Sequence, residues 1–364
     1  MQTNDLKYLL AIVRYPKIGA TRLKKLLNYF PTCKQAFNAS TTELIEAGLD
    51  QKICNEFDIK RKSISPDKEL SLFQKEKLGI LIYQDKNYPK ILNQAFNAPA
   101  VLFYRGNIDL LQSNSIAVVG TRKYSNYGKQ VLPEIIKPLV KNNLTIVSGL
   151  ALGIDALAHS NTLESNGNTI AVLGSSLDKA NIYPTSNRYL ADQILNKGGL
   201  LISEYPINTI PMKHHFPTRN RIISGISLGT VVVEAGESSG ALITAKYALE
   251  QNREVFAIPG PIQAETSKGT NNLIKQGAKP VCTVEDILEE LNIEKIEEYS
   301  ENKKVLPSSP VEQKIIEVLN SEPRHIDKIV KQTNLSPSEI NSNLTIMEMK
   351  GMIKNLGNQN YIKS

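Results

Sequence analysis

Apolar residues in the first part of the chain recur every three or four positions, the spacing that places side chains on one face of an α-helix. They are Leu6, Leu9, Leu10, Ile12, Val13, Leu23, Leu26, Leu27, Phe30, Leu44, Ile45 and Leu49. The turn formers Pro16 and Gly19 interrupt the series. The pattern predicts that residues 1–77 form a small bundle of short helices.

From residue 78 the pattern changes to continuous apolar runs of strand length. The runs are Gly79–Tyr83, Ala100–Tyr104, Ile116–Val119, Leu144–Val147, Thr169–Leu173, Leu200–Ser203, Thr230–Glu234 and Val255–Ile258. Several of the later runs end in a small-residue turn that leads into a helical stretch, which is typical of a parallel sheet covered by helices on both faces. Residues 78–291 are therefore predicted to be an α/β domain with a Rossmann-like, doubly wound and mostly parallel sheet.

The C-terminal part has a third pattern. Glu294–Lys304 is rich in Glu and Lys and precedes a Pro–Ser segment, so we interpret residues 292–309 as a linker. Residues 310–364 then show three helical patterns followed by two short strand patterns. These are Val311–Leu319, Ile326–Lys331, Ser338–Lys350, Met352–Ile353 and Tyr361–Ile362. Their order predicts a winged helix, and Ser336 is expected to cap its third helix with Glu339 at the N3 position.

The sequence does not decide the roles of the two flanking domains. Pro16–Leu23 has the pattern of a helix, a tight glycine turn and a second helix, as in helix-hairpin-helix and SAM-like modules, which either contact DNA or act as scaffolds. Winged helices often contact duplex DNA, but the third helix here has Glu339 and Glu348 and only Lys350 as a cation. Protein docking or autoregulation is the alternative for this domain.

The composition narrows the class of protein. The 364 residues have a net charge of +7, which favours a polyanionic partner. Cys33, Cys54 and Cys282 form no CxxC pair, which argues against a zinc knuckle and a disulfide framework and favours a reducing compartment. No cleavable leader or membrane-spanning run is apparent, so we expect a cytoplasmic protein.

The segment Lys213–Gly225, KHHFPTRNRIISG, gathers cations and rings between two strand patterns. We interpret it as a ligand-facing loop that leads into a helix near Arg221, the alternative being a solvated surface turn. Ligands of doubly wound sheets sit at the carboxyl ends of the strands, where turns and helix N-termini expose backbone N–H groups. The basic segment follows such a strand end and is expected to hang over the same edge.

The familiar catalytic motifs are absent. The sequence contains no Walker A motif, G-x-G-x-x-G turn, G-x-S-x-G elbow or HExxH pair, so no cofactor, metal or nucleophile is expected. Asp155 and His159 lie four residues apart and could form a Ser/His/Asp site with Ser148, but Asp155 is better explained by a bond to His159 or to a neighbouring loop. Glu234 ends a strand and could act on a sugar; an ion pair with Arg219 or Arg221 is the alternative.

A binding site accounts for more of these residues than a catalytic site does. Glycines and serines at the strand ends can offer backbone and hydroxyl donors to phosphates, and Phe216 can stack on a base. The predicted binding residues are Gly120, Arg122, Ser148, Gly149, Gly174, Ser175, Lys213, Phe216, Arg219, Asn220, Arg221, Ser239 and Gly240. Together they predict a site for single-stranded nucleic acid.

Five motifs resemble the DNA-processing protein A (DprA/Smf) family, and they occur in order across the central domain. They are Gly120–Arg122, Ser148–Asp155, Phe216–Gly225, Glu234–Ala245 and Val255–Gly260. The resemblance implies a bacterial protein of natural transformation that binds and protects incoming single-stranded DNA and dimerises through the Rossmann-like domain. It also implies that the protein helps to load the recombinase RecA and counters single-strand-binding protein.

The same resemblance places Arg122, Lys213 and Phe216 at the positions the family uses on DNA, with Arg219, Asn220 and Arg221 shaping the pocket. We therefore expect a non-enzymatic DNA-binding recombination mediator. The alternatives are a nucleotide-processing enzyme resembling a phosphoribohydrolase, with Glu234 as the acting carboxylate, and a transcriptional regulator working through the winged helix.

Overall fold

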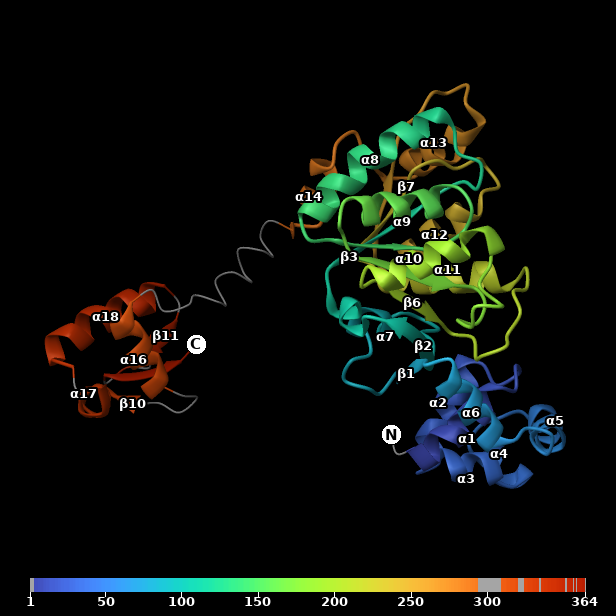
Figure 1. Ribbon diagram of the computed structural model, residues 1–364, viewed down its shortest axis with the longest axis horizontal. Coiled ribbons are helices and arrows are strands. Elements are labelled where there is room, and N and C mark those ends of the chain that lie inside the picture. Colours follow the sequence, from blue (N-terminus) through green and yellow to red (C-terminus); the bar gives the residue numbers. More distant parts are fainter. Residues whose placement is uncertain are drawn as a thin grey trace. The chain divides into compact units, whose positions relative to one another are not determined.

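The computed structural model describes residues 3–293, 309–319, 324–333, 335–350, 352–355, 357 and 359–363. The chain divides into two compact units, Met1–Ile287 and Leu288–Ser364 (Figure 1). Most of the predicted linker, residues 294–308, lies outside the described residues.

The N-terminal segment is helical, as its apolar spacing predicts. Its helices are α1 (Thr3–Val13), α2 (Ala20–Tyr29), α3 (Cys33–Asn38), α4 (Thr41–Glu46), α5 (Gln51–Arg61) and α6 (Pro66–Lys75). Local sequence sets several of the starts. Ser40 and Glu43 form a reciprocal capping box on α4, and Ser65 caps α6 with Pro66 in its first turn.

Within residues 3–293, nine strands form one mixed sheet in the order β1-β2-β6-β5-β4-β3-β7-β8-β9. They are β1 (Gly79–Ile82), β2 (Val101–Gly106), β3 (Ser115–Val119), β4 (Thr145–Ser148), β5 (Thr169–Leu173), β6 (Leu200–Ser203), β7 (Gly229–Val232), β8 (Glu254–Ala257) and β9 (Lys279–Pro280). All neighbouring pairs from β6 through β5, β4, β3, β7 and β8 to β9 are parallel. The two pairs at the other end of the sheet, β1 with β2 and β2 with β6, are antiparallel. The predicted Rossmann-like, mostly parallel sheet is confirmed.

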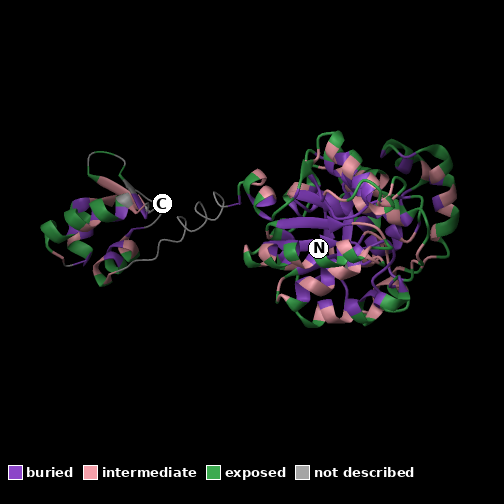
Figure 2. Cartoon of the chain, turned by 90° about the horizontal axis from the view of Figure 1, so that it is seen from above, coloured by how far each residue is buried: buried purple, intermediate pink, exposed green. Residues whose placement is uncertain are grey.

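Helices cover both faces of the sheet. The helices of this region are α7 (Lys90–Asn93), α8 (Asn126–Lys141), α9 (Ile154–Glu164), α10 (Arg188–Asn196), α11 (His215–Gly225), α12 (Gly240–Glu250), α13 (Lys268–Lys275) and α14 (Glu285–Glu290), with short 3-10 turns at Ile108–Gln112, Thr185–Asn187 and Glu265–Ser267. On one face Val172 of β5 shares a core with Ile222 of α11. The next residue back, Ala171, points to the opposite face, where it packs with Ile194 of α10. Figure 2 shows the strands as the buried centre between these layers.

The N-terminal helices share a core with the sheet. Leu9, Leu26 and Phe57 belong to the same buried cluster as Phe103 of β2. Arg14, which directly follows α1, adds a polar link, because its Nη1 donates to the carbonyl of Ile207 at 2.7 Å. The sequence boundary drawn at residue 78 thus falls inside the compact unit, between α6 and β1.

The strand order reverses beside β3. The chain runs from β3 outward through β4, β5 and β6, and then returns to place β7 on the other side of β3. In an open parallel sheet such a switch point leaves a crevice at the carboxyl ends of the two central strands. This topology determines where the candidate site can lie.

The second unit is a winged helix, as predicted. Its elements are α16 (Pro310–Val318), β10 (Arg324–His325), α17 (Ile326–Thr333), α18 (Pro337–Met349), β11 (Ile353–Asn355) and β12 (Asn360–Lys363). The strands form a small sheet in the order β10-β12-β11. Ser336 and Glu339 form the expected capping box at the start of α18. The sequence predicted two strands in this domain, whereas the structure has a third, β10, which pairs with β12. Its two residues, Arg324 and His325, are too few to give a strand pattern in the sequence.

No helix among the described residues has both the length and the apolar character needed to cross a membrane.

Candidate functional site

A cavity of about 660 Å³ opens at the switch point, at the carboxyl ends of the parallel strands. We call it the carboxyl-edge cavity. Its walls come from the turns after β3, β4, β5, β6 and β7 and from the first turns of α11 and α12. Of the residues predicted from sequence, those that line it are Gly120, Arg122, Lys213, Phe216, Arg219, Asn220, Ser239 and Gly240.

Two cations and an aromatic ring give this cavity its character. Arg122 and Lys213 are exposed, and Phe216 is half-buried. The guanidinium carbon of Arg122 lies 5.8 Å from the centroid of the Phe216 ring, within the range of a cation–π contact. Cations at the mouth and a flat apolar surface inside suit a ligand that carries both phosphate and base.

Tyr183, which sequence reasoning missed, stands beside Phe216 in the same cavity. The two ring centroids are 5.6 Å apart and the Tyr183 side chain is largely exposed. The signal that could have found it is the Tyr–Pro pair in the turn region after β5, the same region that supplied the predicted residues Gly174 and Ser175. The cavity thus has a pair of adjacent rings where the sequence analysis placed one.

The basic segment is a helix over most of its length, which corrects the prediction of a loop up to Arg221. Helix α11 begins at His215, and its N-cap residue His214 makes no side-chain capping bond. The prediction failed because the usual Ser, Thr, Asp or Asn start signal is missing and Pro217 sits in the first turn, where a proline is tolerated. In consequence Arg219 and Arg221 are buried against the sheet.

Arg219 builds the wall of the cavity. Its Nη1 donates to the carbonyl oxygens of Gly149, at 2.6 Å, and of Val172. Burial lowers the pKa of Arg219 to about 10, while the attraction of Asp155 opposes that change. Since the backbone carbonyls already take up this nitrogen, Arg219 ties the ends of β4 and β5 together. A direct contact of Arg219 with a ligand stays a prediction.

Arg221 faces away from the carboxyl-edge cavity. Its Nη2 donates to the Glu204 carboxylate at 2.5 Å, and it lines a different cavity. The expected ion pair of Glu234 with Arg219 or Arg221 is therefore wrong. Glu234 is 1% exposed and accepts hydrogen bonds from the Ser125 backbone and hydroxyl groups and from the Thr266 hydroxyl.

Four predicted residues lie behind the wall. Ser148 and Ser175 are buried, and the Ser148 hydroxyl donates to the Val118 carbonyl at 2.7 Å. Gly174 makes room for the stacking ring, because a Cβ there would lie 2.9 Å from Cδ1 of Phe216. At Gly149 a Cβ would lie 2.6 Å from Nη2 of Arg219. These positions support the cavity without lining it.

The start of α12 closes the opposite side. The Ser239 hydroxyl caps this helix by accepting from the Ala241 amide at 3.4 Å, and the Asn220 side chain donates to the Gly240 carbonyl at 3.3 Å. A helix N-terminus carries a partial positive charge, so its presence in the cavity wall adds to the attraction for an anion.

The Ser/His/Asp arrangement does not form. His159 pairs with the Thr169 hydroxyl at 2.7 Å, and Asp155 accepts from the Gly149 amide at 3.1 Å. The neighbouring-loop explanation for Asp155 is thus confirmed. Burial raises the pKa of Asp155, an effect that Arg219 opposes, and burial lowers the pKa of His159 to about 3. Across the described residues, no three His, Cys, Asp or Glu side chains are grouped to hold a metal ion.

Two family models match the chain. Residues 79–292 match the family described as DNA recombination-mediator protein A, and residues 301–359 match the DprA winged helix domain. The chain belongs to the DNA recombination-mediator protein A family. The family resemblance seen in the five sequence motifs is therefore confirmed.

Relatives and solved structures of this family cover much of the chain. Protein Smf of Synechocystis is 34% identical over 97% of this chain and 97% of its own length. DNA processing protein DprA of Streptococcus pneumoniae is 47% identical over 57% of this chain and 72% of its own. The X-ray structure of the S. pneumoniae protein aligns with a TM-score of 0.67 and 37% identity, covering 78% of this chain and 97% of that one.

A second solved structure is also similar to this chain. DNA processing protein A from Helicobacter pylori aligns with a TM-score of 0.53 and 31% identity, covering 59% of this chain and 95% of that chain. Its structure is described as giving insight into a single-stranded DNA binding mode of that protein.

Proposed function

We propose that this protein binds single-stranded DNA in the carboxyl-edge cavity and acts in natural transformation as a non-catalytic recombination mediator. The observation that carries the proposal is that two exposed cations, Arg122 and Lys213, line the same cavity as the half-buried Phe216 ring, with Arg122 in cation–π contact with that ring. Family membership and the single-stranded DNA described for the H. pylori relative support it.

The chemistry of the cavity fits a strand better than a reacting nucleotide. Backbone phosphates need cations near the surface, and bases need flat apolar partners that accept any sequence. Asp155 also lines the cavity, but it is buried and the positive charge of the neighbouring Arg219 balances its negative charge. The base-stacking surface is then Phe216 together with the neighbouring Tyr183.

The placement of Glu234 argues against the phosphoribohydrolase alternative. Its carboxylate oxygens accept from Ser125 and Thr266, and the residue is nearly inaccessible. An acting carboxylate must reach the reacting bond within hydrogen-bond distance. We infer that Glu234 instead fastens the start of α8 to the sheet. Incubation with nucleoside monophosphates is expected to release no base above background.

The partners follow from the family resemblance. We propose that the protein forms a homodimer, protects incoming DNA in the cytoplasm, helps to load the recombinase RecA and counters single-strand-binding protein. Two linked sites in a homodimer would raise the effective concentration of each for the same strand.

Three substitutions test the proposal through oligo-dT affinity. Phe216→Ala is expected to weaken binding by about 1–3 kcal/mol, because it removes one stacking ring. Arg122→Ala and Lys213→Ala are each expected to weaken binding and to lower the slope of log affinity against log salt by roughly 0.7. The matched control is Lys137→Ala, an exposed cation on α8 outside the cavity. Unchanged affinity in all three variants, with the control also unchanged, would contradict the proposal.

A further inference from the structure

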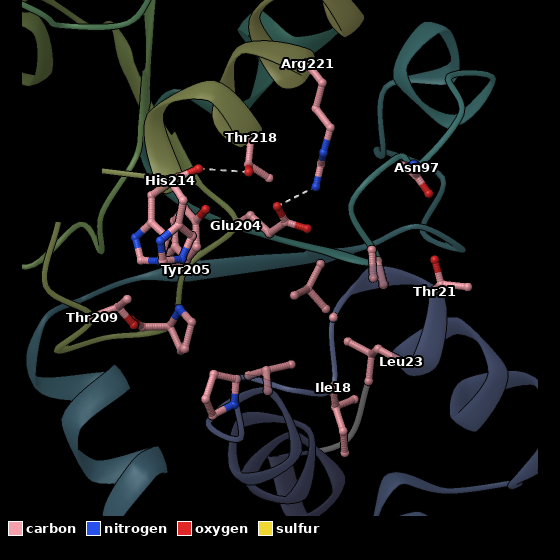
Figure 3. Close-up of a pocket in the computed structure, with 18 of the residues that line it drawn as sticks. Ile18, Thr21, Leu23, Asn97, Glu204, Tyr205, Thr209, His214, Thr218 and Arg221 are labelled. Carbon is pink, nitrogen blue, oxygen red and sulfur yellow. Dashed lines mark hydrogen bonds and ion pairs between the residues drawn. The ribbon is translucent and has the colours of Figure 1, made fainter. Parts of the chain in front are cut away.

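Two aromatic rings line the carboxyl-edge cavity, counted over the residues that the structure describes. Phe216 belongs to the first turn of α11, and Tyr183 belongs to the long turn between β5 and α10. The nearby rings of Tyr205 and His214 line a different cavity (Figure 3). Bases that enter the carboxyl-edge cavity therefore have Phe216 and Tyr183 as stacking partners, and the arrangement of these two rings determines how a strand can lie.

The two rings contact each other at an angle. Their centroids are 5.6 Å apart and their planes are inclined by 45°. A base held between two rings needs them parallel and about 7 Å apart, which is twice the roughly 3.4 Å between stacked bases. No base therefore fits between Phe216 and Tyr183. A base can stack only on the face of each ring that is turned away from the other ring.

The turn that carries Tyr183 is fixed in place by its neighbours. Ile182 and Pro184, on either side of Tyr183, are buried. The guanidinium group of Arg188 donates to the carbonyl of Ile182 at 3.2 Å and also to the carbonyl of Ala180. Tyr183 itself is 45% exposed, and its hydroxyl has no hydrogen-bond partner among the described residues. The ring is thus held at the cavity before any ligand binds, which lowers the entropic cost of stacking a base on it.

The angle between the rings separates neighbouring bases. A base that stacks on a ring lies parallel to that ring, so two bases, one on Phe216 and one on Tyr183, are inclined by the same 45° and cannot stack on each other. Unstacking a step costs free energy. Pyrimidines stack on one another less strongly than purines, and stacking strength is one origin of base preference in proteins that bind single strands.

The charges of the cavity allow two nucleotides. Arg122 and Lys213 are both exposed, so one cation is available for each of two phosphates. Arg122 lies over Phe216 with 5.8 Å between its guanidinium carbon and the ring centroid, within reach of the phosphate of a nucleotide stacked there. Asp155, the carboxylate in the wall, is buried beside Arg219, which balances its charge.

We propose that Tyr183 and Phe216 hold two neighbouring bases of one strand splayed apart, one base on each ring, and that the site thereby favours pyrimidine-rich over purine-rich single strands. The inference rests on the proposed function, since it concerns the same cavity. It goes further by giving Tyr183 a base of its own and by naming the class of base that the site selects.

The test compares oligo-dT and oligo-dA of about 16 nucleotides, bound to the full-length protein at one salt concentration. The variants are Tyr183→Ala, which removes the ring, and Tyr183→Phe, which removes the hydroxyl alone. Tyr189→Ala is the matched control, because Tyr189 is a 72% exposed tyrosine of α10 that lies outside the cavity. Circular dichroism and thermal unfolding verify that all variants fold.

Wild type should bind oligo-dT at least about threefold more tightly than oligo-dA, because oligo-dT loses less stacking. Tyr183→Ala should weaken oligo-dT binding about tenfold and oligo-dA binding less, so that the ratio of the two affinities falls towards one. With one ring left, no step has to be unstacked. Tyr183→Phe and the Tyr189→Ala control should keep both the affinities and their ratio.

A crosslink locates the second base directly. Oligo-dT that carries 5-iododeoxyuridine should, after irradiation, give adducts on Tyr183 as well as on Phe216, identified by mass spectrometry of the wild-type protein. Absence of an adduct on Tyr183 would overturn the inference. Unchanged oligo-dT affinity in Tyr183→Ala, or an equal loss for oligo-dT and oligo-dA, would overturn it as well.

The same measurements separate this inference from the proposed function. If Phe216→Ala weakens oligo-dT binding and Tyr183→Ala does not, the proposed function stands and the two-ring inference falls. If the wild-type protein does not bind oligo-dT, both fall.

Discussion

His159 lies fully buried on α9, and its Nδ1 contacts the Thr169 hydroxyl at 2.7 Å. Burial lowers its pKa to about 3, against an ordinary value of about 6.5 in the unfolded chain. Between these values the unfolded state binds a proton that the folded state does not. The contribution of His159 to stability is therefore fully present above about pH 6.5 and is lost as the pH falls through this window.

The first prediction follows from that sign. The free energy of unfolding should drop by about 2 kcal/mol between pH 7 and pH 5 on account of His159 alone. His159→Gln keeps a polar group near Thr169 but cannot titrate, so its drop over the same interval should be smaller by that amount. Urea unfolding at the two pH values measures both, and parallel losses in the two proteins would refute the assignment.

The sequence was least informative about the surroundings of individual side chains. Arg219 and Arg221 were assigned with Arg122 and Lys213 because all four are cations near strand ends. Once the helix starts at His215, each residue turns by about 100°, so neighbours on α11 face different surroundings. Composition could not indicate that Arg219 bonds to the Gly149 carbonyl or that Arg221 faces another cavity.

At the scale of elements, helix α12 turns its N-terminus to the carboxyl-edge cavity. Ser239 caps this helix and lines the cavity. An aspartate at the N-cap would serve the helix at least as well as serine, because it accepts from the same amides and favours the dipole. It would also place a negative charge where we propose that phosphate binds.

The second prediction separates these effects. Ser239→Asp should leave thermal stability unchanged or slightly raised, and should weaken oligo-dT binding roughly tenfold at low salt. Ser65→Asp, at the N-cap of α6 and outside the carboxyl-edge cavity, is the control for the substitution itself. An unaltered oligo-dT affinity in Ser239→Asp would place the phosphates elsewhere.

Most elements could be predicted from sequence because their signals are local. Continuous apolar runs such as Thr169–Leu173 give parallel strands buried on both faces, and the Ser336–Glu339 capping box gives the start of α18. The missed start of α11 lacks such a signal. The second cavity, which Ile18, Thr21 and Arg221 line, could not be predicted at all, because it depends on how α1 and α2 pack beside β6.

At the scale of the whole molecule, the two units have different surfaces to offer. Every residue that lines the carboxyl-edge cavity belongs to Met1–Ile287. In the winged helix, Lys350 was the one cation that the sequence placed at the end of the third helix, and its amine bonds to the buried carboxylate of Glu312 at 2.6 Å. This amine is therefore engaged within the domain, and whether the winged helix contacts duplex DNA or serves in protein docking or autoregulation stays a prediction.

The third prediction concerns a chain that ends at residue 293. Because its cavity and core are complete, it should unfold cooperatively and bind oligo-dT within about threefold of the full-length affinity. Its salt dependence should also be unchanged, since Arg122 and Lys213 are retained. A loss of oligo-dT binding together with normal unfolding would show that the winged helix takes part in the DNA site.

Strand β9, at one edge of the sheet, bears on how copies of this protein can meet. It consists of only Lys279 and Pro280, paired with the end of β8. A proline has no N–H to donate and a lysine resists burial, so this border is a poor template for another strand. Copies crowded together in a cell or a concentrated sample are thus protected from fibre-like growth along this border of the sheet.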